Sequence, residues 1–425
     1  MIKYSEMTEL ELRAEYESVK ARYDELAASG LKLDMSRGKP AFDQVDGSNG
    51  MFEMITAETD AKSRDGIDCR NYGGLDGLPE LKELFGEILG ISASNVIVGG
   101  NASLNMMFDF IAQAMTHGVG AEPWMKQGTV KFLCPVPGYD RHFGICEYFG
   151  IEMINVPLRD DGPDMDLVEE LIKDSSVKGM WCVPKYSNPD GIVYSDEVVR
   201  RLANMKPAAK DFRIMWDNAY VIHHIFGDSA VEMANIYDEC VKAGDPDKVI
   251  MFTSTSKISF PGAGVAAMAA SDANIALIKK RMNYQTIGPD KLNHLRHARM
   301  FPNMEAVLKQ MQFHAGMLRP KFQMVLDGLD KELQGLGIAR WKKPQGGYFI
   351  SLFAPNGTAK RIVGLCKDAG LVLTGAGATY PYGIDPDDSN IRIAPSFPVI
   401  EELKVATELL CVATKLASLE KLLEM

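Results

Sequence analysis

The chain has 425 residues, of which 46% are hydrophobic, so it can bury a large core in two domains or in one large domain with a smaller lobe. Its net charge of -11 argues against nonspecific binding to nucleic acid or to an anionic membrane. Seven scattered cysteines without a Cys-x-x-Cys pair favour buried thiols in a reducing cytoplasm over a disulfide framework or a metal site. Because no apolar run approaches the ~20 residues of a membrane span, we expect a soluble cytoplasmic protein.

The first part of the chain combines helical patterns with short apolar runs. An amphipathic stripe predicts a helix over residues 7–29, ended by Gly30. Helical stretches separate the apolar runs, so we expect an α/β domain with a mostly parallel sheet and functional residues just past the carboxyl ends of its strands. The predicted strands are residues 96–98, 130–133, 180–183, 214–216 and 249–252.

After residue 300 the pattern changes. A long helical stretch is followed by strand candidates at residues 341–353 and 391–394 and by helices at residues 358–369 and 399–422. This order predicts a smaller α+β lobe. We therefore expect a large domain over residues 51–300 and a small domain made of residues 1–50 and 301–425.

Small and polar residues follow the first predicted strand. Gly99-Gly100-Asn101-Ala102-Ser103 leads into a helix from Leu104 to about Ala114. Such a helix start exposes backbone N–H groups, and the helix dipole adds attraction for a phosphate. The alternative, in which the glycines only form a tight turn, stays open at this point.

Two further loops follow strands of the series. The turn Pro135-Val136-Pro137-Gly138 presents Tyr139, which suits the stacking of a flat heteroaromatic ring but is equally typical of a tyrosine at a loop rim. Asn188-Pro189-Asp190-Gly191 is primarily a turn, and its asparagine can also donate a hydrogen bond into a site.

Asp217 comes directly after the strand at residues 214–216. A carboxylate in that place loses hydration unless it finds a cationic or N–H partner. A pyridinium nitrogen is such a partner, and its protonation makes pyridoxal phosphate an electron sink. Capping of a helix is the rival role for this aspartate.

A single lysine follows the last strand of the series. Lys257 lies in Ser254-Thr255-Ser256-Lys257-Ile258-Ser259. A carbonyl cofactor needs a lysine amine with a lowered pKa, and neighbouring hydroxyls can hold a phosphate without competing as nucleophiles. Taken alone, the segment is also typical of a solvated turn.

The order of these motifs resembles that of the fold type I pyridoxal-phosphate aminotransferases. Each motif alone is weak, but seven of them in order predict that α/β fold with its large and small domains. Gly-Gly-Asn-Ala-Ser-Leu-Asn and Ser-Lys-Ile-Ser-Phe-Pro-Gly further resemble the divergent bacterial branch related to MocR-type aminotransferase domains, which includes aspartate aminotransferases. The resemblance covers nearly the whole chain, from Ser36-Arg37-Gly38-Lys39-Pro40 to Arg392. The seven motifs are Tyr72 with Gly77-Leu78-Pro79-Glu80-Leu81, Gly99-Gly100-Asn101, Pro137-Gly138-Tyr139, Asn188-Pro189-Asp190-Gly191, Asp217-Asn218-Ala219-Tyr220, Ser254-x-Ser256-Lys257 and Asn390-Ile391-Arg392-Ile393.

The resemblance implies catalytic and cofactor-binding roles. Lys257 would form a Schiff base with pyridoxal 5'-phosphate and shuttle a proton, while Asp217 would keep the ring nitrogen protonated. Tyr220 and Asn188 would hydrogen-bond the phenolic oxygen of the ring, on which Tyr139 would stack. The phosphate would be held by Gly100, Asn101, Ala102, Ser254, Ser256 and Tyr72 of a neighbouring subunit, which implies a homodimer with shared active sites.

The resemblance also implies how substrate binds. Arg392 would bind the α-carboxylate, because its planar guanidinium matches a carboxylate bidentately, and Gly38 would close over the substrate with its backbone. For the side-chain carboxylate of aspartate or glutamate we prefer Arg141. Arg37 and Lys39 are rivals, and a solvent-facing Arg141 is a further alternative.

One departure from the family concerns the phosphate. Common aminotransferases carry an arginine about eight residues after the lysine, whereas Pro261-Gly262-Ala263-Gly264-Val265 has none. We expect another residue to compensate for the missing charge.

We therefore predict a pyridoxal-phosphate-dependent aminotransferase that exchanges amino groups between aspartate and 2-oxoglutarate by a ping-pong mechanism. The alternatives are another specificity, for alanine or of the aromatic or kynurenine type, and a lyase or decarboxylase on the same fold. A non-enzymatic ligand-sensing regulator would need a DNA-binding module, and the ~30 residues before Ser36 are too few and too acidic for one.

Overall fold

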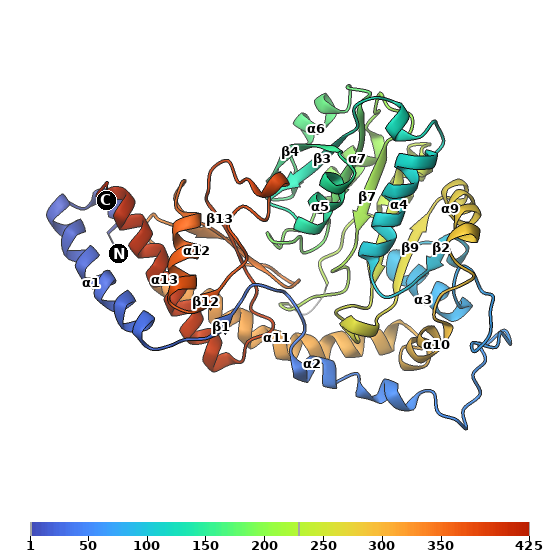
Figure 1. The fold of residues 1–425 in the computed structure, drawn as a ribbon, viewed down its shortest axis with the longest axis horizontal. Helices are drawn as coiled ribbons and strands as arrows, with labels where there is room; N and C mark the ends of the chain where they lie inside the picture. The colour runs from blue at the N-terminus through green and yellow to red at the C-terminus, as the bar shows by residue number, and fades with distance from the viewer. Residues whose placement is uncertain (1, 228–229, 425) are drawn as a thin grey trace.

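The computed structural model describes residues 2–227 and 230–424, whose strands gather in two main sheets (Figure 1). The larger sheet has eight strands in the order β2-β9-β8-β7-β6-β3-β4-β5. The pairs from β8 through β7, β6 and β3 to β4 are parallel, while β9 runs antiparallel to both neighbours and β5 antiparallel to β4. The strands are β2 (Val96–Val98), β3 (Lys131–Val136), β4 (Glu152–Arg159), β5 (Gly162–Pro163), β6 (Val177–Cys182), β7 (Arg213–Asp217), β8 (Val249–Ser254) and β9 (Ala266–Ala270).

Helices cover both faces of the large sheet, which is why its central strands are buried along their whole length. One apolar cluster joins α4 and α9 to one face, and a second joins α3, α7 and α8 to the other. The mostly parallel α/β prediction is confirmed. These helices are α3 (Pro79–Leu89), α4 (Ser103–His117), α5 (Asp140–Tyr148), α6 (Met165–Leu171), α7 (Asp196–Asn204), α8 (Ile236–Lys242), α9 (Asp272–Gln285) and α10 (Lys291–Met300).

The second sheet is antiparallel and has the order β10-β11-β13. Beside it, α1 packs against α13, which also contacts α11 and α12 (Figure 1). The parallel pair β1 (Leu33–Asp34) and β12 (Leu371–Val372) ties the N-terminal segment to this lobe. The remaining elements are α1 (Glu9–Ala28), α2 (Phe42–Asp46), α11 (Met304–Leu333), β10 (Arg340–Trp341), β11 (Ile350–Phe353), α12 (Ala359–Asp368), β13 (Asn390–Ile393) and α13 (Ile400–Leu422).

The strand candidate at residues 341–353 is interrupted in the structure. Only its ends, in β10 and β11, form strands, and residues 342–349 make a loop. The loop packs against the turn at Tyr186: a Cβ on Gly346 would lie 2.2 Å from the His223 carbonyl oxygen and 2.8 Å from the Tyr186 ring. Two adjacent glycines therefore permit a close backbone approach that a continuous strand would not.

Within the described part of the chain, no helix is long and apolar enough to cross a membrane.

Candidate active site

A cavity of about 400 Å³ lies where the carboxyl ends of β3, β6, β7 and β8 face the second sheet. Its walls include Asp217 and Ser254 at the ends of β7 and β8, Tyr139 and Asn188 from the segments after β3 and β6, and Arg392 from β13. The structure thus brings together residues as distant in the sequence as Arg37 and Arg392, which lie 355 positions apart. This is the sheet edge at which α/β proteins concentrate ligand-binding residues.

Lys257 projects into this cavity from the loop after β8. Its Nζ lies 5.1 Å from the centroid of the Tyr220 ring and 5.7 Å from that of Tyr348. Burial lowers the pKa of the Lys257 ammonium, and the Asp217 carboxylate opposes this effect. A lysine with a lowered pKa carries more neutral amine at neutral pH and is therefore a better nucleophile.

Asp217 lines the cavity, and a buried histidine lies directly behind its carboxylate. His142 Nε2 is 3.0 Å from Asp217 Oδ2, and the imidazole stacks on Trp181 with 4.2 Å between ring centroids. Asp217 Oδ1 is buried without a hydrogen-bond partner among the described residues. Since an unpaired buried carboxylate oxygen is costly, Oδ1 is suited to accept a hydrogen bond from a bound N–H group.

Three further predicted residues line the same cavity. Tyr139 meets the His142 ring edge-on at 5.0 Å, and burial raises the pKa of its phenol to about 12. Tyr220 is buried, which raises its pKa well above the usual value. Both phenols therefore stay protonated at neutral pH and can donate hydrogen bonds. The Asn188 side chain accepts a hydrogen bond from Arg392 Nη1 at 3.3 Å.

An anion-binding corner is formed by the start of α4 and the hydroxyls before Lys257. Ala102 and Ser103 line the cavity at the start of this 15-residue helix, and no side chain caps its first turn. Ser254 Oγ donates to Ser256 Oγ at 3.0 Å. Free N–H groups and hydroxyls in one corner suit a phosphate.

Two predicted phosphate ligands, Gly100 and Asn101, are not among the residues that line this cavity, and their role at the phosphate stays a prediction. The Asn101 side-chain oxygen accepts a hydrogen bond from the Gly264 N–H at 2.7 Å, and Gly100 lines a neighbouring cavity of about 280 Å³. Asn101 therefore braces the loop after Lys257 in this conformation, and its side-chain oxygen is already occupied.

Helix α10 also holds the loop that carries Lys257 in place through hydrogen bonds. These contacts were not predicted from the sequence. His297 Nε2 lies 2.8 Å from Ser259 Oγ and 3.2 Å from Thr255 Oγ1. Asn293 Nδ2 donates to the Gly264 carbonyl at 2.9 Å. Burial lowers the pKa of His297 to about 4, so its neutral ring acts as a hydrogen-bonding brace at neutral pH.

Arg392 occupies a polar wall of the cavity. Its Nη1 lies 3.3 Å from Asp140 Oδ1, its Nη2 donates to Thr374 Oγ1 at 3.1 Å, and its guanidinium lies 4.9 Å from the Phe349 ring centroid. Asp140 thus occupies part of the carboxylate-binding face of the arginine. The sequence signalled Arg392 but not its partners, which come from three distant segments.

Three cations surround the cavity opening, and all three are exposed. The side chains of Arg37 and Arg141 make no hydrogen bond or ion pair with the described residues, whereas Lys39 Nζ lies 3.7 Å from the Phe397 ring centroid. Gly38, which lies between Arg37 and Lys39, packs so closely on Phe349 that a Cβ there would lie 2.4 Å from the ring.

Tyr72 is not part of the cavity wall. Its side chain is 80% exposed on the surface of the single chain. Because Tyr72 is exposed and does not line the cavity of its own chain, its role at a partner's phosphate stays a prediction.

The cavity as a whole suits a flat ring that carries a protonated nitrogen and a phosphate. Asp217 Oδ1 offers an acceptor, Tyr139 an aromatic face, Lys257 an amine and the start of α4 an anion corner. Metal chemistry has no comparable donor set: no cluster of three His, Cys, Asp or Glu side chains with ligand geometry occurs in residues 2–227 and 230–424.

Comparisons with known proteins agree with this geometry. The family model for aspartate amino-transferases matches residues 7–425. An aspartate aminotransferase of Corynebacterium glutamicum is 46% identical over 407 residues, which are 95% of this chain and 94% of that protein.

Solved structures give the same result. The crystal structure of an aspartate transaminase from C. glutamicum superposes with a TM-score of 0.96, at 44% identity and 99% coverage of both chains. The α-aminoadipate aminotransferase LysN of Thermus thermophilus, complexed with N-(5'-phosphopyridoxyl)-L-leucine, has a TM-score of 0.75 at 19% identity over 94% of this chain and 95% of that one. At that identity the second likeness shows the fold alone.

Proposed function

Because this chain belongs to the aspartate aminotransferase family, we propose that it exchanges amino groups between aspartate and 2-oxoglutarate with pyridoxal 5'-phosphate bound at Lys257. Its activity class, amino-group transfer, follows from the family, and its fold is that of the fold type I enzymes. The aspartate specificity rests on the named relative and on the free arginines at the cavity opening.

One observation carries the cofactor proposal. Asp217 Oδ1 is buried and unpaired in the described structure, while His142 holds Oδ2 at 3.0 Å. A pyridinium N–H is the partner that this oxygen lacks, and the bound cofactor supplies an electron sink once its ring nitrogen is protonated. His142 orients the carboxylate, and its stacking on Trp181 fixes the imidazole.

The lysine has two tasks in this proposal. Its amine, with a pKa lowered by burial, would hold the cofactor covalently before substrate binds. After the substrate amine displaces it, the freed Nζ would take the proton from the substrate α-carbon. Tyr220 and Asn188 would donate hydrogen bonds to the ring oxygen, for which Asn188 would use its amide N–H groups.

Arg392 would bind the substrate α-carboxylate. Asp140 Oδ1 lies 3.3 Å from Arg392 Nη1, so the substrate α-carboxylate would replace the Asp140 carboxylate beside the guanidinium. At the other end of the substrate, Arg141 would bind the side-chain carboxylate. It lines the cavity, follows Tyr139 by two residues and has no acidic partner in the described chain.

The remaining proposals concern assembly. A homodimer would bring Tyr72 of one protomer to the phosphate of the other, since Tyr72 is exposed and outside its own cavity. The start of α4 with Ser254 and Ser256 would hold the phosphate, partly compensating for the missing arginine.

Absorbance spectroscopy of the purified holoenzyme tests the proposed reaction. L-Aspartate should remove the visible band of the lysine-bound cofactor, and 2-oxoglutarate should restore it, because each half of a ping-pong transfer leaves the enzyme in a different form. A band that responds to alanine or an aromatic amino acid but not to aspartate would overturn the specificity. Turnover of aspartate without any oxo acid would instead favour a lyase or decarboxylase.

A further inference from the structure

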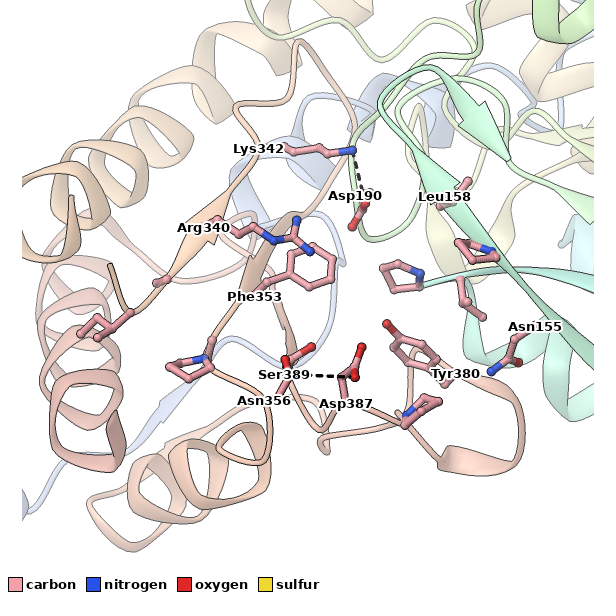
Figure 2. A pocket seen from close by; sticks show the side chains of 18 of the residues that line it. Asn155, Leu158, Asp190, Arg340, Lys342, Phe353, Asn356, Tyr380, Asp387 and Ser389 are labelled. Atoms are coloured by element: carbon pink, nitrogen blue, oxygen red, sulfur yellow. Dashed lines mark hydrogen bonds and ion pairs between the residues drawn. The ribbon is translucent and has the colours of Figure 1, made fainter. Parts of the chain in front are cut away.

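A second cavity, of about 670 Å³, lies between the two lobes and is larger than the active-site cavity. We call it the seam cavity. Asn155 and Leu158 of β4 line one side, and Arg340 of β10 and Phe353 of β11 line the other (Figure 2). None of the residues proposed for catalysis lines it.

One side of the seam cavity carries an uncompensated cation. The Arg340 guanidinium lies over the Phe353 ring, 3.8 Å from its centroid, and forms no ion pair with a described carboxylate. Lys342 is less available, because its Nζ lies 3.1 Å from Asp160 Oδ1 and 3.7 Å from Asp190 Oδ2. Arg340 is therefore the group in this wall that is free to meet a ligand carboxylate.

Carboxylates face the same space. Asp190 is 3% exposed, and its Oδ1 has no hydrogen-bond partner in the described structure. The Asp387 side chain accepts one hydrogen bond, from Asn356 Nδ2 to Oδ1 at 3.1 Å. Figure 2 shows the side chains of Arg340, Asp190 and Asp387 turned toward the cavity. A buried carboxylate oxygen without a partner favours a ligand that donates N–H groups.

Apolar side chains form part of the remaining walls, next to the polar residues Asn155, Asn356, Tyr380 and Ser389. Val136, Pro157, Leu158 and Ile338 line the cavity together with the Phe353 ring. A ligand here would gain from burying an aliphatic or aromatic side chain, at roughly 25 cal/mol for each Å² removed from water.

We propose that the seam cavity binds a free α-amino acid with an apolar side chain, its carboxylate on Arg340 and its ammonium between Asp190 and Asp387. A simple anion would face the carboxylates of Asp160, Asp190 and Asp387, and a simple cation would leave Arg340 unpaired. Only a zwitterion satisfies both signs of charge in one space.

The seam cavity borders two turns of the active site. Pro137 and Asp190 line the seam cavity, while Tyr139 and Asn188, two residues away in the same turns, line the active-site cavity. The second turn is tightly packed: a Cβ on Gly191 would lie 2.5 Å from Pro344 Cβ. An amino acid in the seam cavity thus contacts the segments that position the proposed cofactor-binding side chains.

Equilibrium dialysis with L-leucine tests the proposal without turnover. The holoenzyme is reduced with borohydride, and Arg392→Ala removes carboxylate binding in the active site. We expect one leucine site per chain. In this background, Arg340→Ala and the nearly isosteric Asp387→Asn should each weaken leucine binding about tenfold, as for the loss of one charge-assisted contact.

Two controls make the result decisive. Lys343→Ala removes a neighbouring exposed cation that pairs with Asp330, and it should leave leucine binding unchanged. The fragments 4-methylpentanoate and 3-methylbutylamine, which lack the amine and the carboxylate respectively, should bind at least about tenfold more weakly than leucine. Equal binding of either fragment, an unchanged affinity in Arg340→Ala, or no leucine site at millimolar concentration would each overturn the proposal.

Discussion

At the scale of single residues, sequence predicted the groups that follow strands and missed those that act across the fold. Lys257, Asp217 and Asn188 were predictable because each lies at or beyond the carboxyl end of a buried strand, and parallel strands end at one edge. His142 lacked such a signal. It lies within α5, and its contact with Asp217 joins residues 75 positions apart. The hydrogen bond of the Asn101 side chain could not be predicted from the sequence either, because its partner, the Gly264 N–H, lies 163 positions away.

The residue that reads the substrate side chain is open to a direct test. Arg141→Ala should lower kcat/KM for aspartate by roughly 10- to 100-fold, which is the effect of losing one charge-assisted contact. The kcat/KM for alanine, which has no side-chain carboxylate, should stay unchanged. Steady-state kinetics with both amino acids measures the discrimination. Arg37→Ala is the matched control, since Arg37 lines the same opening and is equally free of described partners. Unchanged discrimination in Arg141→Ala, or its loss in Arg37→Ala instead, would contradict the assignment.

At the scale of elements, the period of the apolar pattern predicted most of the strands and long helices to within a few residues. The helix expected at 7–29 spans Glu9–Ala28, and Gly30 follows it with φ +70°. The loop at 342–349 could not be predicted, because its apolar residues pack in the core as strand residues do. Gly346 and Gly347 are required because the loop backbone packs closely on Tyr186 and His223, and no local sequence pattern predicts that contact.

A glycine inside the central sheet should be intolerant of a methyl group. A Cβ on Gly179 in β6 would lie 2.3 Å from the buried Phe132 ring. Gly179→Ala should therefore lower the free energy of unfolding by about 1–3 kcal/mol through overpacking, measured by urea denaturation. The control is Gly364→Ala in α12, where a Cβ meets nothing within 4 Å and helix propensity should raise stability by up to about 1 kcal/mol. Equal stability of the two variants would refute the packing argument.

At the scale of the whole molecule, the site exists because two sheets face each other. Arg392 from β13 contacts Asn188 from the loop after β6 of the large sheet, and these residues lie 204 positions apart. Sequence could predict two lobes from the change of pattern after residue 300, but not which surfaces they present to each other. The domain boundaries at residues 50/51 and 300/301, the kinship with MocR-type domains and the cytoplasmic location stay predictions.

A shared active site predicts complementation between two inactive variants. Lys257→Ala and Tyr72→Phe each damage every site of their own dimer. In a hybrid dimer, one site would carry both changes and the other would carry neither, so co-expression should restore activity well above that of either parent. Steady-state assays of separated hybrids, with both parent dimers as controls, measure the gain. Activity equal to the average of the parents would contradict a contribution of Tyr72 across the interface.

The central claim is that Lys257 is the covalent anchor of pyridoxal phosphate. The most direct measurement is peptide mass spectrometry of the purified holoenzyme after borohydride reduction, which fixes the lysine-bound cofactor as a stable secondary amine. We predict a phosphopyridoxyl group on the peptide that contains Lys257 and on no other peptide, and none in Lys257→Ala. An unmodified Lys257 in a fully loaded enzyme, or the label on another lysine, would contradict the account.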